Sequence, residues 1–178
     1  MKKIVITLCL IFFVFFTFLF VSVMEFNSVA AVQETVVYNL PYPGILPDNP
    51  LYILKAIRDQ LVIFGTRENV KKAHLYLLLS DKRIAMAIAL SKKGKEKQAI
   101  DIAGKAEKYF FNIPQLLIDA KKQGSGSSSE FIQTLKLSNA KHREILDSFL
   151  KDFPQGLNDS INGVIKINEQ VKNAVDRL

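Results

Sequence analysis

Two histidines, His74 and His142, are the side chains in this sequence best suited to metal binding or acid–base catalysis. Neither lies in an HExxH or Glu-x-x-His spacing, and the nearest carboxylate along the chain to His142, Glu144, is off its helical face. A metal ion needs several ligands that face one point. We therefore expect no metal and no cofactor, since a metal-binding bundle would require His74 and His142 to face each other.

Nucleophilic catalysis has little support either. The serines lie in a flexible linker or on predicted helices, whereas an activated serine needs a neighbouring base on a strained turn. Gly124 and Gly126 follow no predicted strand and precede no lysine, which argues against a phosphate-binding loop. The single cysteine, Cys9, lies in an apolar run near the N-terminus, so the rest of the chain has no disulfide. These residues predict a protein that is not an enzyme.

The charge favours contact with anionic surfaces. The formal net charge is +7, and a basic surface outside a cell attracts anionic lipid head groups or wall polymers. We expect no nucleic-acid partner. Because the lysines recur along the chain, most of them are expected to be solvated on helix faces. A denser group of cations lies at one predicted turn and a pair lies further on: Lys92, Lys93, Lys95 and Lys97, then Lys121 and Lys122.

The N-terminal residues have the pattern of an export signal. Lys2 and Lys3 precede an uncharged apolar run at 4–23. Small residues fit cleavage after Ala30, whereas the length of the run also fits a retained membrane anchor. Both alternatives place the body outside the cytoplasmic membrane, because positive flanks stay inside. We therefore expect a signal peptide or signal anchor at 1–30 and an extracytoplasmic protein, secreted or tethered.

The remaining chain divides into a leader and a helical domain. Closely spaced prolines at 41, 43 and 47 make 31–48 an extended leader, and 49–178 has helical periodicity without strand-like alternation. Leu54, Ile57 and Leu61 belong to one apolar stripe of the first helix, which ends with Phe64. The predicted helices are 49–64, 68–93, a segment from 95 that Pro114 kinks or splits, 129–152 after a Gly/Ser linker at 124–129, and 157–178.

The last two predicted helices carry regular seams. Ser138 and His142 lie on the seam of 129–152, and Asn168 interrupts an otherwise apolar seam in 157–178. A polar residue at such a position fixes register when it meets another polar group. We expect its partner to be Ser138, His142 or the same Asn168 in a second chain, which would make a coiled-coil homo-oligomer. The pattern predicts an all-α, up-and-down antiparallel bundle of four to five helices.

Residues 38–55 resemble the N-terminal motif of an uncharacterised family of exported bacterial all-helical domains, of the form LPxxPLYxLK. A second match runs from 72–75 to 81–85, on the long helix. The resemblance implies an extracytoplasmic helical domain of unknown function, which in some members follows regulatory or anti-sigma-like membrane segments. It supplies no catalytic residues. The motif positions are Leu46, Pro47, Asp48, Pro50, Leu51 and Tyr52.

The function that we expect is therefore a non-enzymatic, extracytoplasmic helical module that contacts a protein or an envelope component through a helix face or the proline-rich leader. A second hypothesis is binding of anionic lipid or wall polymer through the lysine-rich turn. A metal-binding bundle is a third.

Overall fold

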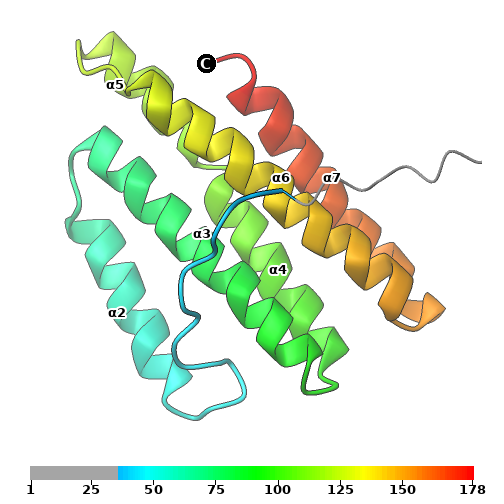
Figure 1. Cartoon of the computed structure of the whole chain (residues 1–178). Helices are drawn as coiled ribbons and strands as arrows, with labels where there is room; N and C mark the ends of the chain where they lie inside the picture. Colours follow the sequence, from blue (N-terminus) through cyan, green and yellow to red (C-terminus); the bar gives the residue numbers. More distant parts are fainter. Residues whose placement is uncertain (1–35) are drawn as a thin grey trace, which may run out of the picture. The chain divides into compact units, whose positions relative to one another are not determined.

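The computed structural model describes residues 36–178 (Figure 1). The predicted export segment, the cleavage site after Ala30 and the first part of the leader lie outside the described residues. Within the described part, no helix combines the length and the apolar composition that a membrane crossing would need.

The described chain is all-helical, as predicted. Each helix runs antiparallel to the one before it, except that α4 and α5 are two parts of one interrupted helix (Figure 1). The helices are α2 (Tyr52–Gly65), α3 (Asn69–Ser91), α4 (Glu96–Phe110), α5 (Ile113–Lys122), α6 (Ser129–Asp152) and α7 (Asn158–Val175), with a short 3₁₀ turn η2 (Gln155–Leu157) before α7.

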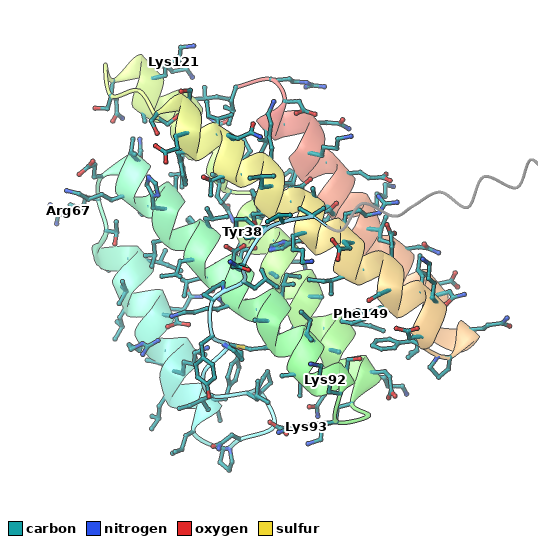
Figure 2. The ribbon with its side chains drawn as sticks, viewed as in Figure 1. Tyr38, Arg67, Lys92, Lys93, Lys121 and Phe149 are labelled. Carbon is teal, nitrogen blue, oxygen red and sulfur yellow. The ribbon has the colours of Figure 1, made fainter. Side chains whose placement is uncertain are left out.

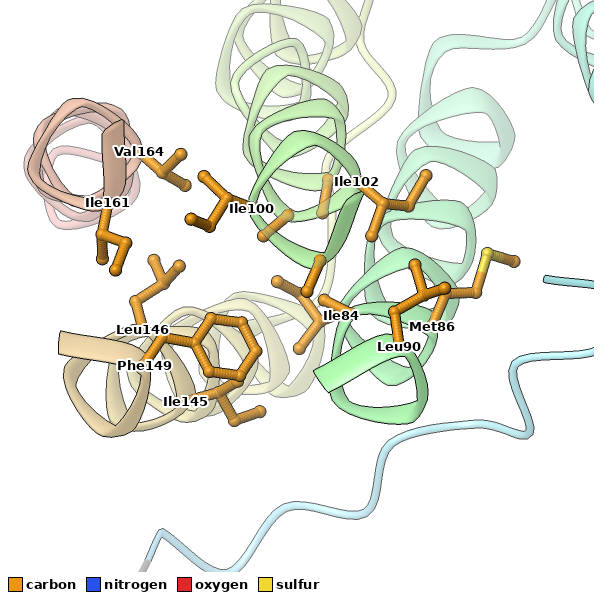
Figure 3. Packing of buried hydrophobic residues seen from close by; sticks show 14 of the residues in the cluster. Ile84, Met86, Leu90, Ile100, Ile102, Ile145, Leu146, Phe149, Ile161 and Val164 are labelled. Atoms are coloured by element: carbon orange, nitrogen blue, oxygen red, sulfur yellow. The ribbon is translucent and has the colours of Figure 1, made fainter. Parts of the chain in front are cut away.

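Helices α3, α4, α6 and α7 form a four-helix bundle. In cross-section α3 lies beside α4 and α6, and α7 lies beside the same two on the far side (Figure 3). Helix α5 continues α4 along the N-terminal part of α3, and α2 packs on the outside of α3 (Figure 1). The central position of α3 explains why its apolar segment from Ala85 to Leu90 is buried or half-buried.

Local sequence signals set the helix ends. Pro114 lies in the first turn of α5, where its missing N–H leaves no bond unmade, and the helix is split beside it at Phe111 and Asn112. Ser128 caps α6 by accepting a hydrogen bond of 3.1 Å from the backbone N–H of Phe131. Gly94 ends the turn after α3 with a φ of 67°, which an L side chain rarely adopts.

Helix α2 begins three residues later than predicted. The Oδ1 atom of Asn49 accepts a hydrogen bond from the N–H of Leu51, and the backbone carbonyl of Asn49 accepts one from Tyr52. These bonds form a turn that delays the first helical residue to Tyr52.

Small residues on α4 allow it to lie close against its neighbours. Ala99, Ala103 and Ala106 are completely buried, and bulkier side chains of α3, α6 and α7 fill the space around them (Figure 3). The larger core cluster lies toward the α3–α4 turn, and a second cluster with Phe110 and Leu135 lies toward α5.

The described part of the leader packs on the bundle. Leu40 and Leu46 rest against the larger core cluster, and the backbone N–H of Val36 donates to Glu144 of α6 over 2.9 Å. The leader therefore crosses the α3–α6 face and then turns into α2 (Figure 1).

Candidate functional site

A layer of polar side chains crosses the middle of the four-helix bundle. Each helix contributes one member at a position where its seam would otherwise be apolar: Asp81 from α3, Glu107 from α4, His142 from α6 and Asn168 from α7. All four are at most 3% exposed. We call these four residues the polar layer.

His142 lies between the two carboxylates of the polar layer. Its Nδ1 is 2.8 Å from Oε1 of Glu107, and its Nε2 is 3.0 Å from Oδ1 of Asp81. Burial alone would lower the pKa of His142, but the negative charge of Glu107 and the hydrogen bonds to both carboxylates outweigh burial and raise this pKa to about 9. The imidazolium therefore donates to both acids at neutral pH.

Asp81 also receives two hydroxyl donors. The Ser138 hydroxyl donates to Oδ1 over 2.6 Å, and the Tyr38 hydroxyl donates to Oδ2 over 2.6 Å. Tyr38 belongs to the leader and lies across the bundle at this level (Figure 2). Burial and the bond to Asp81 both raise the pKa of Tyr38 far above its usual value, so the phenol remains a donor. The leader thus closes one side of the polar layer.

Asn168 meets partners that the sequence did not predict. Its Nδ2 donates to the backbone carbonyl of Asn139 over 3.2 Å and to Oε2 of Glu107 over 3.3 Å, while the Asn139 amide donates back to the Asn168 carbonyl. The prediction that Ser138 or His142 is its direct partner is wrong, because these residues lie on the Asp81 side of the layer. Asn168 reaches them only through Glu107.

The two histidines do not face each other. The ring of His74 stacks on Phe131 with centroids 3.6 Å apart, whereas His142 meets Phe110 edge-on at 5.6 Å. Among residues 36–178 no group of three or more His, Cys, Asp or Glu side chains is arranged to hold a metal ion. The expectation that Glu144 is the nearest acid to His142 holds only along the chain, since Asp81 and Glu107 come from other helices.

The charged members of the polar layer are enclosed. His142 and Glu107 are fully buried, and their charges meet partners within the layer. A pocket of about 320 Å³ between α6 and α7 is lined by Asn168 and Asn139 at the edge of the layer. The geometry is that of a structural element that aligns four helices.

The lysine-rich turn is partly occupied by the leader. Lys93 and Lys95 donate to Oδ2 of Asp48 over 3.0 and 2.9 Å, and these bonds lower the pKa of Asp48. Lys92 and Lys97 are exposed at the same end of the bundle. Figure 2 shows Lys121 at the opposite end from Lys92 and Lys93, so the sequence-predicted cations do not form one patch.

The N-terminal motif divides between the core and the surface. Leu46 and Tyr52 pack against the core, Asp48 holds the two lysines, and Pro47 is half-buried. Pro50 and Leu51 are exposed. The motif therefore fastens the leader to the α3–α4 turn and positions the start of α2.

The apolar stripe of α2 faces away from the bundle. Seven of the fourteen exposed large hydrophobic side chains among residues 36–178 lie between Leu51 and Phe64. The stripe residues are 65% (Leu54), 53% (Ile57), 66% (Leu61) and 87% (Phe64) exposed, and Ile53 is 67% exposed. Such a stripe ordinarily faces a core. We call Ile53, Leu54, Ile57, Leu61 and Phe64 the outer stripe.

The opposite face of α2 fastens the helix to the bundle through mixed contacts. Asp59 and Ile63 are buried there, and Asp59 lies 3.8 Å from the guanidinium of Arg83. The Arg83 guanidinium also lies 4.0 Å above the ring centre of Tyr109, whose hydroxyl accepts a hydrogen bond from Gln60. This polar attachment orients the outer stripe outward.

A groove runs along one edge of the outer stripe. It has a volume of about 620 Å³ and lies between α2 and Tyr109 of α4, with Arg83 in its wall. Ile53, Ile57 and Phe64 line its α2 side. The Nε atom of Arg83 is buried and makes no hydrogen bond to any described residue.

The sequence contained a signal for the polar layer that reasoning from single helices missed. Asp81 lies four residues after Leu77 and three residues before Ile84, and both of these seam residues are buried. Glu107 has the same spacing to the buried seam residues on its own helix. A carboxylate at such a place must find a buried partner. His142 and Asn168, the two polar seam residues that had been identified, are the other half of that layer.

Comparison with known proteins gives one match. Residues 44–178 match the family model described as Domain of unknown function (DUF5667). No curated protein matches the chain, and no solved structure matches it.

Proposed function

The chain belongs to this family, whose description assigns no activity, and we propose that it is a non-enzymatic, extracytoplasmic module that binds a protein or an envelope component through the outer stripe of α2. The observation that carries this proposal is the direction of the stripe. Five large apolar side chains, each more than half exposed, project from one helix on the side opposite to its buried residues Asp59 and Ile63.

A continuous apolar stripe that faces outward indicates a binding surface and not a chance exposure of single hydrophobic residues. Single exposed hydrophobic residues are normal on protein surfaces, whereas a contiguous apolar strip ordinarily marks a binding site. The spacing of three and four residues from Leu54 to Phe64 makes the strip continuous along α2.

The polar layer supports the non-enzymatic part of the proposal. His142, whose pKa is raised to about 9, is the described side chain best suited to acid–base chemistry near neutral pH, and it is fully buried between Asp81 and Glu107. A general acid or base must reach the substrate. These groups are committed to one another and to the alignment of the helices.

The extracytoplasmic part rests on the sequence pattern of 1–30, which lies outside the described residues. It is tested by labelling intact cells that carry Asn162→Cys together with Cys9→Ser with a thiol reagent that cannot cross membranes. Because Asn162 is exposed on α7 and lies outside the outer stripe, export predicts labelling in intact cells. Labelling that requires cell lysis would contradict export.

The interaction is tested by site-specific photocrosslinking in the cell envelope. A photoreactive side chain at Leu61 is expected to give a discrete crosslinked product, and the same group at Leu137, an exposed leucine of α6, serves as the matched control. Equal and diffuse crosslinking at both positions would contradict the proposal.

A further inference from the structure

The outer stripe has chemistry that narrows the proposed partner. We infer that α2 docks on the surface of an anionic lipid bilayer; this inference rests on the proposed interaction function. The outer stripe would lie in the interfacial region, with its flanking cations at the head groups.

The charges on α2 favour a negatively charged partner. Between Leu51 and Arg67 the only acidic residue is Asp59. Its carboxylate is buried and paired with Arg58 at 2.7 Å and Arg83 at 3.8 Å. Beyond Arg67, the exposed carboxylate of Glu68 pairs with Lys71 at 2.7 Å. From Leu51 to Lys72 the five cations Lys55, Arg58, Arg67, Lys71 and Lys72 outnumber the two acids Asp59 and Glu68, so this face has exposed apolar side chains and an excess of positive charge.

This combination is the one that an interfacial amphipathic helix uses. Such a helix lies in the plane of the membrane, buries apolar side chains at the boundary between head groups and acyl chains, and pairs nearby Lys or Arg with anionic lipid. Here the bundle occupies the side where a free amphipathic helix would have its polar face. Figure 2 shows Arg67 pointing into solvent at the end of the α2–α3 turn.

A second copy of the chain fits the same face less well. In a two-fold contact between outer stripes, each α2 would meet the same residues of its partner. The cations around the stripe would enter the contact from both chains, and Glu68 is the one exposed carboxylate between Leu51 and Lys72 that could pair with them. Like charges at an interface oppose association, whereas anionic lipid neutralises them.

The length of the chain ahead of the bundle is compatible with a membrane contact. Thirteen positions separate Val23, the last residue of the predicted anchor, from Val36. An extended segment of that length spans up to about 45 Å.

The experiment uses the full chain in lipid nanodiscs, with Cys9→Ser so that one introduced thiol carries a fluorophore. The label is placed by Phe64→Cys, and in the matched control by Leu137→Cys on α6. The nanodiscs contain equal parts of phosphatidylcholine and phosphatidylglycerol together with a lipid-bound quencher. We expect quenching to be several times stronger at position 64 than at 137, and to weaken in phosphatidylcholine alone and at high salt.

Two substitutions test whether the stripe itself makes the contact. Ile57→Gln with Leu61→Gln, in the chain labelled at 64, is expected to reduce quenching by lipid about tenfold, since two large apolar side chains leave the interface. Phe111→Gln, a control at an exposed phenylalanine between α4 and α5, is expected to leave it unchanged.

Three outcomes would overturn the lipid inference. Equal quenching at 64 and 137 would show that α2 does not approach the bilayer. Energy transfer between two chains labelled at 64, abolished by the stripe substitutions, would identify a second copy as the occupant. A discrete protein crosslink at Leu61 without quenching by lipid would leave the proposed interaction function standing with a protein partner. If α2 showed neither quenching by lipid nor a discrete protein crosslink at Leu61, the proposed interaction function would be contradicted as well.

Discussion

The hydroxyl of Tyr38 lies 2.6 Å from Oδ2 of Asp81 and joins the leader to the central layer of the bundle. Asp81 simultaneously accepts from Ser138 and lies 3.0 Å from Nε2 of His142. The leader is therefore part of the folded domain, because it supplies a donor that a buried carboxylate needs.

Removal of this donor is expected to destabilise the fold. Tyr38→Phe should lower the free energy of unfolding by about 1–3 kcal/mol, since a buried acceptor of Asp81 loses its partner. Urea unfolding followed by circular dichroism measures the change. Tyr42→Phe, at a tyrosine that is 83% exposed, is the matched control, and an equal effect of both variants would contradict the role of Tyr38.

The stability of the domain is expected to fall as the pH rises above neutrality. The pKa of His142 is raised from 6.5 to about 9, so the folded state keeps a proton that the unfolded chain loses. The resulting stabilisation is fully present below about pH 6.5 and is lost as the pH rises through 9, by up to about 3 kcal/mol.

Urea unfolding at a series of pH values tests this expectation. His142→Gln should flatten the dependence between about pH 6.5 and 9, whereas His74→Gln, at the exposed histidine beside Phe131, should preserve it. A dependence that survives in His142→Gln would assign the titration to another group.

Asn168 is expected to stabilise the bundle although it occupies an apolar seam. Asn168→Leu removes the donor to Glu107 and to the Asn139 carbonyl, and should lower the free energy of unfolding by about 1–3 kcal/mol. Asn162→Leu on the exposed face of α7 is the control. A stabilised Asn168→Leu variant would show that leucine packing outweighs the lost hydrogen bonds.

The cap of α6 gives a smaller, local effect. Ser128→Ala should lower the free energy of unfolding by about 1 kcal/mol, because the N–H of Phe131 loses its acceptor. Ser127→Ala changes the neighbouring serine outside the cap position and should change stability far less. Thermal unfolding of both variants distinguishes the cap from a general effect of linker composition.

Substitutions on the outer stripe should leave the fold intact. Leu61→Gln and Phe64→Gln are expected to change the free energy of unfolding by no more than about 0.5 kcal/mol, since both side chains are largely exposed. Leu135→Ala, at a fully buried leucine, should lower it by about 2–5 kcal/mol. A large loss from the stripe variants would mean that α2 supports the core.

Most of the helical framework could be predicted from local sequence. Pro114 marks the division between α4 and α5, Ser128 marks the start of α6, and the seam from Phe131 to Phe149 is the buried face of that helix. These signals act within a few residues, so a pattern along the chain contains them. The all-α antiparallel prediction is confirmed for the described residues.

The direction of α2 could not be predicted in the same way. Periodicity from Leu54 to Phe64 shows that the helix has an apolar side, but it does not say whether that side meets the bundle or solvent. The choice depends on Asp59, which pairs with Arg83 on α3. That contact joins residues 24 positions apart in different helices.

The pairing of residues within the polar layer could not be predicted for a related reason, although each helix showed a polar residue in its seam. His142 is 35 positions from Glu107 and 61 from Asp81. Their meeting depends on how three helices are aligned along their axes. Each residue separately resembles an isolated polar defect in a seam.

Along the chain, the segment 124–129 separates the two acidic members of the polar layer from the other two members. On its N-terminal side lie the two carboxylates, Asp81 and Glu107, and on its C-terminal side lie the imidazolium of His142 and the neutral donor Asn168. A polypeptide cut within this largely exposed segment would yield one fragment with buried acids and one with their buried cation. The two fragments would therefore carry opposite buried charges. Pairing of these charges would favour association of the fragments and would fix the axial alignment of their helices.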